Sequence, residues 1–170
     1  VDMEYFSPLV VEKDFDLVFT GNMNYSPNII SAETLAREIL PEIHKTKPNT
    51  KLVLAGASPH RRVKSLKSSK VVVTGWVDDL REYYSRSKIF IAPLTIGTGL
   101  QNKLLEAMAM NLPCITSPLA NSALLAKDNK EILVGNKIEE YVKHIHYLLD
   151  NQETAQSLAD NGRNFVKNNY

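Results

Sequence analysis

The sequence predicts an α/β fold with three layers, in which helices cover both faces of a mostly parallel sheet of about six strands. Short, continuously apolar segments recur along the chain, and several of them end at a glycine. Such segments are typical of strands that are buried on both faces. Segments with helical spacing of apolar residues lie between them, which is the alternation expected of a parallel sheet.

The expected strands are the apolar segments 14–21, 51–56, 70–75, 88–94, 113–117 and 131–135. The first helix is expected after Ser26, because a serine followed by proline is typical of a capped helix start. Pro41 should break or restart that helix, since proline lacks a backbone donor. Further helices are expected over 78–87, 99–111, 138–150 and 153–168.

The bulk composition is that of an ordinary globular domain and excludes several classes of protein. The chain has 170 residues, 44% of them apolar, and its net charge is 20 − 19 = +1. A single cysteine, Cys114, excludes an intrachain disulfide and a cysteine zinc site, and its apolar neighbours indicate a buried side chain. No apolar segment approaches the ~20 residues of a membrane-spanning helix. The chain lacks an initiator methionine, so we expect a piece of a longer protein.

One segment between the fourth and fifth expected strands carries the strongest chemical signal. Gly97 and Gly99 precede a helical pattern that bears Lys103 and Glu106. Free N–H groups at a helix start attract anions, and Gly99 lets a ligand approach them closely. Lys103 would add a positive charge, and Glu106 would accept hydrogen bonds from a diol such as a ribose. Their spacing of three residues also fits a surface ion pair.

Other polar residues have simpler interpretations. Asp78 and Asp79 suggest a metal site, but their position before a helix favours capping. The basic segment 60–70 fits a solvated helix face, or a contact with an anionic membrane surface or with phosphates. It lacks interleaved aromatic residues, so no nucleic-acid partner is expected. Tyr83 and Tyr84 are expected to be packing residues.

Several stretches, in order along nearly the whole chain, resemble one known family. They are "VDMEYFSP", "LVFTGNM", "KLVLAG", "VVVTGWVDDLREYYSRSKIFIAPL" and "LLEAMAMNLPCITS". The chain resembles the C-terminal, donor-binding half of the GT-B glycosyltransferases, in the large retaining family often called family 4. The resemblance implies a Rossmann-like domain over 14–170, with 151–170 as its C-terminal helix. Residues 1–13 would be the linker from a preceding domain.

The resemblance also implies a site for a nucleotide-diphosphate-sugar donor, with no cofactor and no bound metal. Glu106 matches the second glutamate of the family's E-x7-E motif, which typically binds the ribose. The loop between the fourth strand and the next helix would hold the diphosphate and sugar through Gly97, Thr98, Gly99, Leu100, Gln101 and Asn102. The first loop would face the same groups through Gly21, Asn22 and Asn24, and Trp76 and Val77 would lie against the base.

Two departures from the family pattern bear on activity. Thr98 stands where the first glutamate of E-x7-E would fall, and the first loop has Asn22 and Asn24 in place of the usual arginine and lysine. Lys103 is the candidate to supply the missing positive charge and stabilise the leaving group. A non-catalytic or degenerate nucleotide-binding domain is the alternative. A generic phosphoacceptor-like module would need an aspartate where Gly21 and Gly56 stand.

For the full-length protein, the resemblance implies sugar transfer with retention to a glycan or glycolipid acceptor. The acceptor would be bound mainly by the N-terminal domain, so these 170 residues alone would not catalyse sugar transfer. The expected location is the cytoplasm, with peripheral association at the inner face of the plasma membrane as an option. The donor sugar, the base and the acceptor stay open.

Overall fold

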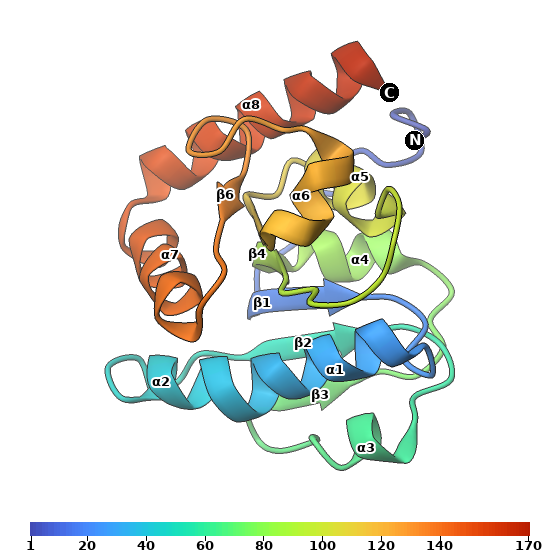
Figure 1. Cartoon of the computed structure of the whole chain (residues 1–170), viewed down its shortest axis with the longest axis vertical. Coiled ribbons are helices and arrows are strands. Elements are labelled where there is room, and N and C mark those ends of the chain that lie inside the picture. The colour runs from blue at the N-terminus through green and yellow to red at the C-terminus, as the bar shows by residue number, and fades with distance from the viewer.

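The computed structural model describes all 170 residues and confirms the α/β prediction. Six strands form one sheet in the order β3-β2-β1-β4-β5-β6, and every neighbouring pair is parallel (Figure 1). The strands are β1 (Phe15–Thr20), β2 (Leu52–Ala55), β3 (Val71–Val73), β4 (Ser87–Ala92), β5 (Cys114–Thr116) and β6 (Leu133–Val134). Each lies within a segment expected to be a strand, except that β4 begins one residue earlier.

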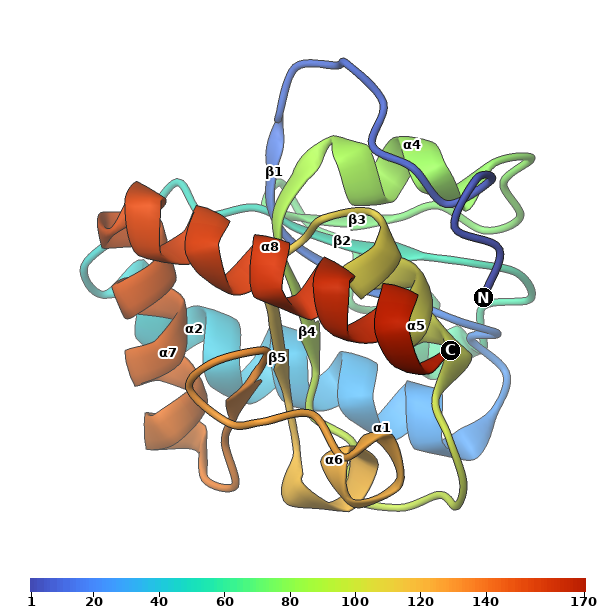
Figure 2. The same ribbon diagram turned by 90° about the horizontal axis from the view of Figure 1, so that it is seen from above.

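Helices cover both faces of this sheet. They are α1 (Ser26–Thr34), α2 (Leu40–His44), α3 (Arg61–Lys64), α4 (Leu80–Ser85), α5 (Asn102–Ala109), α6 (Pro118–Leu124), α7 (Ile138–Asp150) and α8 (Gln152–Asn169). Figure 2 shows α1 and α2 on one side of the sheet and α4 and α5 on the other. This is the three-layer arrangement that the sequence predicts.

The helix that carries Lys103 and Glu106 begins later than expected. We predicted a helix from Gly99, but α5 begins at Asn102 and Gln101 occupies the cap position. The backbone angle φ is +116° at Gly97 and +78° at Gly99. These values are incompatible with a right-handed helix, so the two glycines form a loop instead.

The first helix also differs from its prediction. Tyr25 occupies the cap position and Ser26 is the first helical residue, so Ser26 is not the cap. Pro41 restarts the helix, as expected, because α2 begins at Leu40 with Pro41 in its first turn, and a π-helix (η1, Leu35–Ile39) joins α1 to α2. The Leu40 N–H bonds to the Leu35 carbonyl five residues earlier. This wider turn adds one residue ahead of the proline and keeps the chain helical.

One helix was not expected from the sequence. In α6, the side chain of Ser117 accepts a hydrogen bond from the Ala120 N–H, and Pro118 is the first helical residue. The serine-proline pair is itself a helix-start signal. The helix extends only to Leu124, too short for a clear apolar periodicity.

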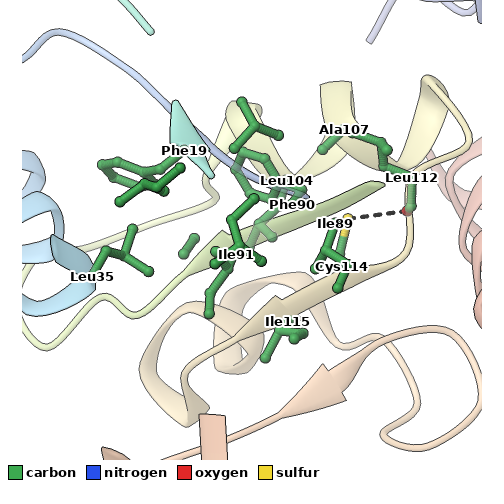
Figure 3. Packing of buried hydrophobic residues seen from close by; sticks show 14 of the residues in the cluster. Phe19, Leu35, Ile89, Phe90, Ile91, Leu104, Ala107, Leu112, Cys114 and Ile115 are labelled. Atoms are coloured by element: carbon green, nitrogen blue, oxygen red, sulfur yellow. Dashed lines mark hydrogen bonds between the residues drawn. The ribbon is translucent and has the colours of Figure 1, made fainter. Parts of the chain in front are cut away.

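The core is a single cluster of 42 buried residues around the central strands. Figure 3 shows β4 side chains packed against Leu104 and Ala107 of α5, which fixes that helix on the sheet. Cys114 lies in the same cluster and its thiol donates to the Leu112 carbonyl at 3.3 Å. The prediction of a buried cysteine is confirmed.

The C-terminal helix α8 closes the molecule by packing on α5. A Cβ at its Gly162 would lie 2.9 Å from the Glu131 carbonyl oxygen and 3.2 Å from the Met108 Cε, so the glycine lets α8 approach both. Both views place the two termini close together (Figures 1 and 2). None of the helices combines the length and the apolar character that crossing a bilayer requires.

Candidate functional site

A cavity of about 440 Å³ opens at the carboxyl ends of the central strands. The sheet order reverses between β1 and β4, and ligands of open α/β sheets bind at this kind of position. The lining comes from the N-terminal segment, the loops after β1, β2 and β3, and the inner face of α5. Six residues expected from the sequence line it together: Gly21, Asn22, Trp76, Val77, Lys103 and Glu106.

Two glycines let the loops after β1 and β2 meet at the floor of this cavity. Gly21 and Gly56 have φ values of +149° and +145°, which side chains rarely adopt. A Cβ on Gly56 would lie 1.9 Å from the Gly21 carbonyl oxygen. A Cβ on Gly21 would lie 2.6 Å from the side chain of Asn28. The cavity therefore depends on the absence of side chains at both positions.

Lys103 enters the cavity from the first turn of α5. Its ammonium group donates to Oδ1 of Asn28 and lies 5.0 Å from the centre of the Phe19 ring. Burial lowers the pKa of Lys103 to about 8, and the charge of Glu106 opposes this shift. Below that pH the side chain is a cation at the cavity wall. It forms no salt bridge with Glu106, so the surface ion-pair interpretation is wrong.

Asn28 was not singled out from the sequence. It is 4% exposed, and its amide nitrogen donates to the Asn22 carbonyl at 2.9 Å while its oxygen accepts from Lys103. Asn22 in turn accepts the Asn24 N–H through its side chain at 2.9 Å. One buried amide thus ties the loop after β1 to the lysine on α5. The sequence separation of 75 residues between Asn28 and Lys103 hides this contact from local patterns.

The carboxylate of Glu106 is held by a hydrogen bond from a buried tyrosine. The Tyr84 hydroxyl donates to Oε2 of Glu106 at 2.9 Å and lies 2.8 Å from Oγ1 of Thr20. Tyr84 packs as expected, but the prediction of a packing role alone is incomplete. Burial, together with the nearby charge of Glu106, raises the pKa of Tyr84 well above its usual value. The tyrosine is therefore a fixed neutral donor.

The rim of the cavity carries the loop after β3 and part of the N-terminal segment. Trp76 is 77% exposed there, and its indole N–H lies 3.4 Å from Oδ1 of Asp78. Asp79 accepts the Arg81 N–H at 2.9 Å and also binds the Arg81 guanidinium, so the capping interpretation of Asp79 is confirmed. The same guanidinium lies 4.0 Å from the centre of the Tyr5 ring. No group of three or more His, Cys, Asp or Glu is placed to share a metal ion.

The structure does not bring all of the expected residues together. Gly97, Thr98, Gly99 and Gln101 line a separate cavity of about 210 Å³, whose other wall is α6. Asn24, Leu100 and Asn102 are exposed and line neither cavity. Gly97 nevertheless lies beside α1, because a Cβ there would be 3.7 Å from the Pro27 ring.

Comparison with known proteins identifies the family. The model of the family described as glycosyl transferases group 1 matches residues 14–151. The chain belongs to this family. A relative named alpha-monoglucosyldiacylglycerol synthase, from Acholeplasma laidlawii, is 31% identical over 133 residues, which are 73% of this chain and 33% of the relative. This member of the glycosyl transferases group 1 family spans less than half the length of the relatives it matches.

Solved structures share the fold, among them a domain of a group 1 glycosyl transferase. The C-terminal domain of a group 1 protein (LpcC) from Francisella tularensis superposes with a TM-score of 0.72 at 17% identity, covering 100% of this chain and 98% of that one. The Anabaena protein HepE, in complex with UDP and glucose, gives a TM-score of 0.80 at 11% identity and covers 100% of this chain and 51% of its own. The domain is thus a C-terminal GT-B domain with a Rossmann-like sheet.

Proposed function

We propose that this domain binds the nucleotide-diphosphate-sugar donor of a glycosyltransferase that moves the sugar to a glycan or lipid-linked acceptor. The observation that carries the proposal is the pairing, in one cavity, of the cationic Lys103 with the oriented carboxylate of Glu106. A nucleoside diphosphate offers a matching pair, an anionic diphosphate and a ribose with two hydroxyl donors. The HepE complex with UDP and glucose, which has the same fold, supports the assignment.

Each group of the donor has a chemical counterpart on the protein. Glu106 accepts from the ribose hydroxyls, since an ionised carboxylate is an acceptor only. Lys103 and the backbone of the loop at Gly21 and Asn22 bind the diphosphate. Trp76 and Val77 lie against the base at the rim. The sugar extends toward the loop at Gly97 and Thr98, where Gly97 lies beside Pro27 of α1.

The chemical step follows from this placement. The bond between the anomeric carbon and the diphosphate oxygen breaks, a glycosidic bond to the acceptor oxygen forms, and the nucleoside diphosphate leaves with its bonding electrons and takes up the proton of the acceptor hydroxyl. Lys103 stabilises the negative charge that develops on the leaving oxygen, and electrostatic stabilisation of this kind contributes strongly to catalysis. We propose transfer with retention and without a metal, with the acceptor held by a region outside these residues.

The direct test is a thermal-shift panel on the full-length protein with UDP-, GDP-, ADP- and TDP-sugars. Binding to the native state raises the melting temperature, so one base should give a clear stabilisation. Lys103→Ala and Glu106→Gln should each reduce that stabilisation, while Lys167→Ala on the exposed side of α8 serves as the control. The proposal fails if no nucleotide sugar stabilises the protein.

A second candidate function is nucleotide-sugar binding without catalysis. Thr98 in place of the family glutamate favours it, because a neutral hydroxyl replaces an acidic side chain in the loop next to the sugar position. An assay of donor hydrolysis and of sugar transfer by the full-length protein distinguishes the two candidate functions. Donor binding with no turnover under any acceptor condition would support the second candidate.

A further inference from the structure

Three hydroxyl and carboxyl groups from distant parts of the chain form a line that ends in the cavity. Thr20 ends β1, Tyr84 lies on α4, and Glu106 lies on α5. The contact between the Thr20 and Tyr84 oxygens measures 2.8 Å, and the contact between the Tyr84 and Glu106 oxygens measures 2.9 Å. Thr20 and Tyr84 are at most 1% exposed, so water does not compete for their hydroxyl groups.

Proton counting fixes the direction of both hydrogen bonds. A carboxylate only accepts, so the single hydroxyl proton of Tyr84 goes to Oε2 of Glu106. The Tyr84 oxygen must then act as the acceptor for the hydroxyl of Thr20. Both donors point toward the carboxylate, and hydrogen bonds in such a chain strengthen one another.

This line leaves one oxygen of Glu106 without a protein partner. Oε2 accepts from Tyr84, while no side chain or backbone group hydrogen-bonds to Oε1. A free glutamate on a helix surface samples several rotamers, and immobilising such a side chain opposes binding. With Oε2 held, Oε1 presents its lone pairs in one direction before any ligand arrives.

We propose that Tyr84, supported by Thr20, is the positioning residue that lets this site distinguish a ribonucleotide from a 2′-deoxyribonucleotide. The inference rests on the proposed role of Glu106 as the ribose ligand and adds the residue that gives this role its selectivity. A carboxylate held in one orientation accepts from both ribose hydroxyls at once. A mobile carboxylate rearranges around whichever hydroxyl is present, and the difference between the two sugars shrinks.

The test measures the dissociation constants of UDP, GDP and ADP and of their 2′-deoxy forms on the full-length protein. Wild type should bind the preferred ribonucleotide ~10-fold or more tightly than its deoxy form, since a hydrogen bond to a charged group is stronger than one between neutral groups. In Tyr84→Phe this ratio should fall to about 2 to 3, mainly through loss of affinity for the ribonucleotide. Tyr83→Phe makes the same chemical change on the neighbouring residue and should keep the wild-type ratio.

Thr20→Val provides a second variant that leaves the Tyr84 hydroxyl in place and removes its donor. Its ratio should lie between those of wild type and Tyr84→Phe, and it keeps the test decisive where Tyr84→Phe folds poorly. If Tyr84→Phe folds and keeps the wild-type ratio, the positioning role is overturned and donor binding stays intact. If only Thr20→Val folds, an unchanged ratio in that variant overturns the positioning role in the same way. Wild-type protein that binds no ribonucleotide, or does not distinguish the sugars, overturns the assignment of Glu106 itself.

Discussion

The amide oxygen of Asn28 accepts a hydrogen bond from the ammonium group of Lys103, across the interface between α1 and α5. The nitrogen of the same amide donates to the loop after β1. Because Asn28 is buried, the lysine has a fixed partner and a fixed direction in the absence of a ligand. The cation at the cavity wall is therefore oriented by the fold.

Replacing Asn28 with leucine should destabilise the domain and weaken nucleotide binding together. The change removes two hydrogen bonds and leaves the Lys103 ammonium without its partner, while the Asn22 carbonyl still accepts from the Tyr25 N–H at 3.2 Å. An unmet polar group costs about 1–3 kcal/mol where it is shielded from water. Urea unfolding measures the first effect and nucleoside diphosphate titration the second. Asn169→Leu at the end of α8 is the control, and equal behaviour of the two variants would contradict the role of Asn28.

Replacing Lys103 with alanine should lower donor affinity and turnover and destabilise the domain modestly. The variant removes a cation whose burial is unfavourable, as its lowered pKa indicates, but it also leaves the buried oxygen of Asn28 without its donor. Loss of one charge-assisted contact should weaken diphosphate binding ~10-fold or more. Calorimetric titration and steady-state kinetics of the full-length protein measure both. Unchanged affinity and turnover would remove Lys103 from the site.

Donor binding should weaken at alkaline pH in a way that depends on Lys103. Its pKa is lowered from 10.5 to about 8, so the cation is present at pH 7 and is lost as the pH rises through 8. The affinity for a nucleoside diphosphate should fall between pH 7 and pH 9. In Lys103→Ala the affinity should be low and nearly constant over that range. A wild-type profile that is flat to pH 9 would contradict this expectation.

Replacing Gly56 with alanine should be strongly destabilising. The new Cβ would lie 1.9 Å from the Gly21 carbonyl, at a backbone φ of +145°. The cost should be at least ~3 kcal/mol, which corresponds to a fall in melting temperature of roughly 6–12 °C. Gly75→Ala is the matched control, since it also has a positive φ but no atom within 4 Å of its Cβ. Similar melting temperatures for both variants would show that the loops can separate.

The thiol of Cys114 should react with a disulfide reagent only after unfolding. Burial raises the pKa of this thiol far above its ordinary range, and the attacking species is the thiolate. The reaction rate in native buffer should therefore be limited by opening of the domain. It should rise to that of a free cysteine in denaturant. Rapid labelling of the native protein would contradict the packing in Figure 3.

Local patterns in the sequence were sufficient to predict most of the fold. Apolar strands that end in glycine and amphipathic helices can each be recognised within a short stretch of sequence. All six strands and the helices α7 and α8 were therefore predicted close to their observed bounds. The predicted start of α5 was wrong because the residue pattern after Gly99 has helical spacing. Only the backbone angles show that Gly97 and Gly99 belong to a loop.

The candidate site was predictable only in part, since its contacts join distant segments. Lys103 and Glu106 were singled out by spacing and by resemblance, and both line the cavity. Asn28 and Tyr84 were missed as site residues, because their partners lie 75 and 22 residues away along the chain. Thr98 was expected at the same site, but it faces a second cavity beside α6.

The neighbouring position of β1 and β4 has a consequence for how the domain folds. Phe15 pairs with Ser87, so this central ladder closes a loop of about seventy residues before the line from Thr20 to Glu106 can form. The hydroxyl proton of Tyr84 is shielded only once that closure is complete. The exchange rate of this proton with solvent therefore reports how often the central ladder opens. A single proton resonance would then follow the opening and closing of the domain.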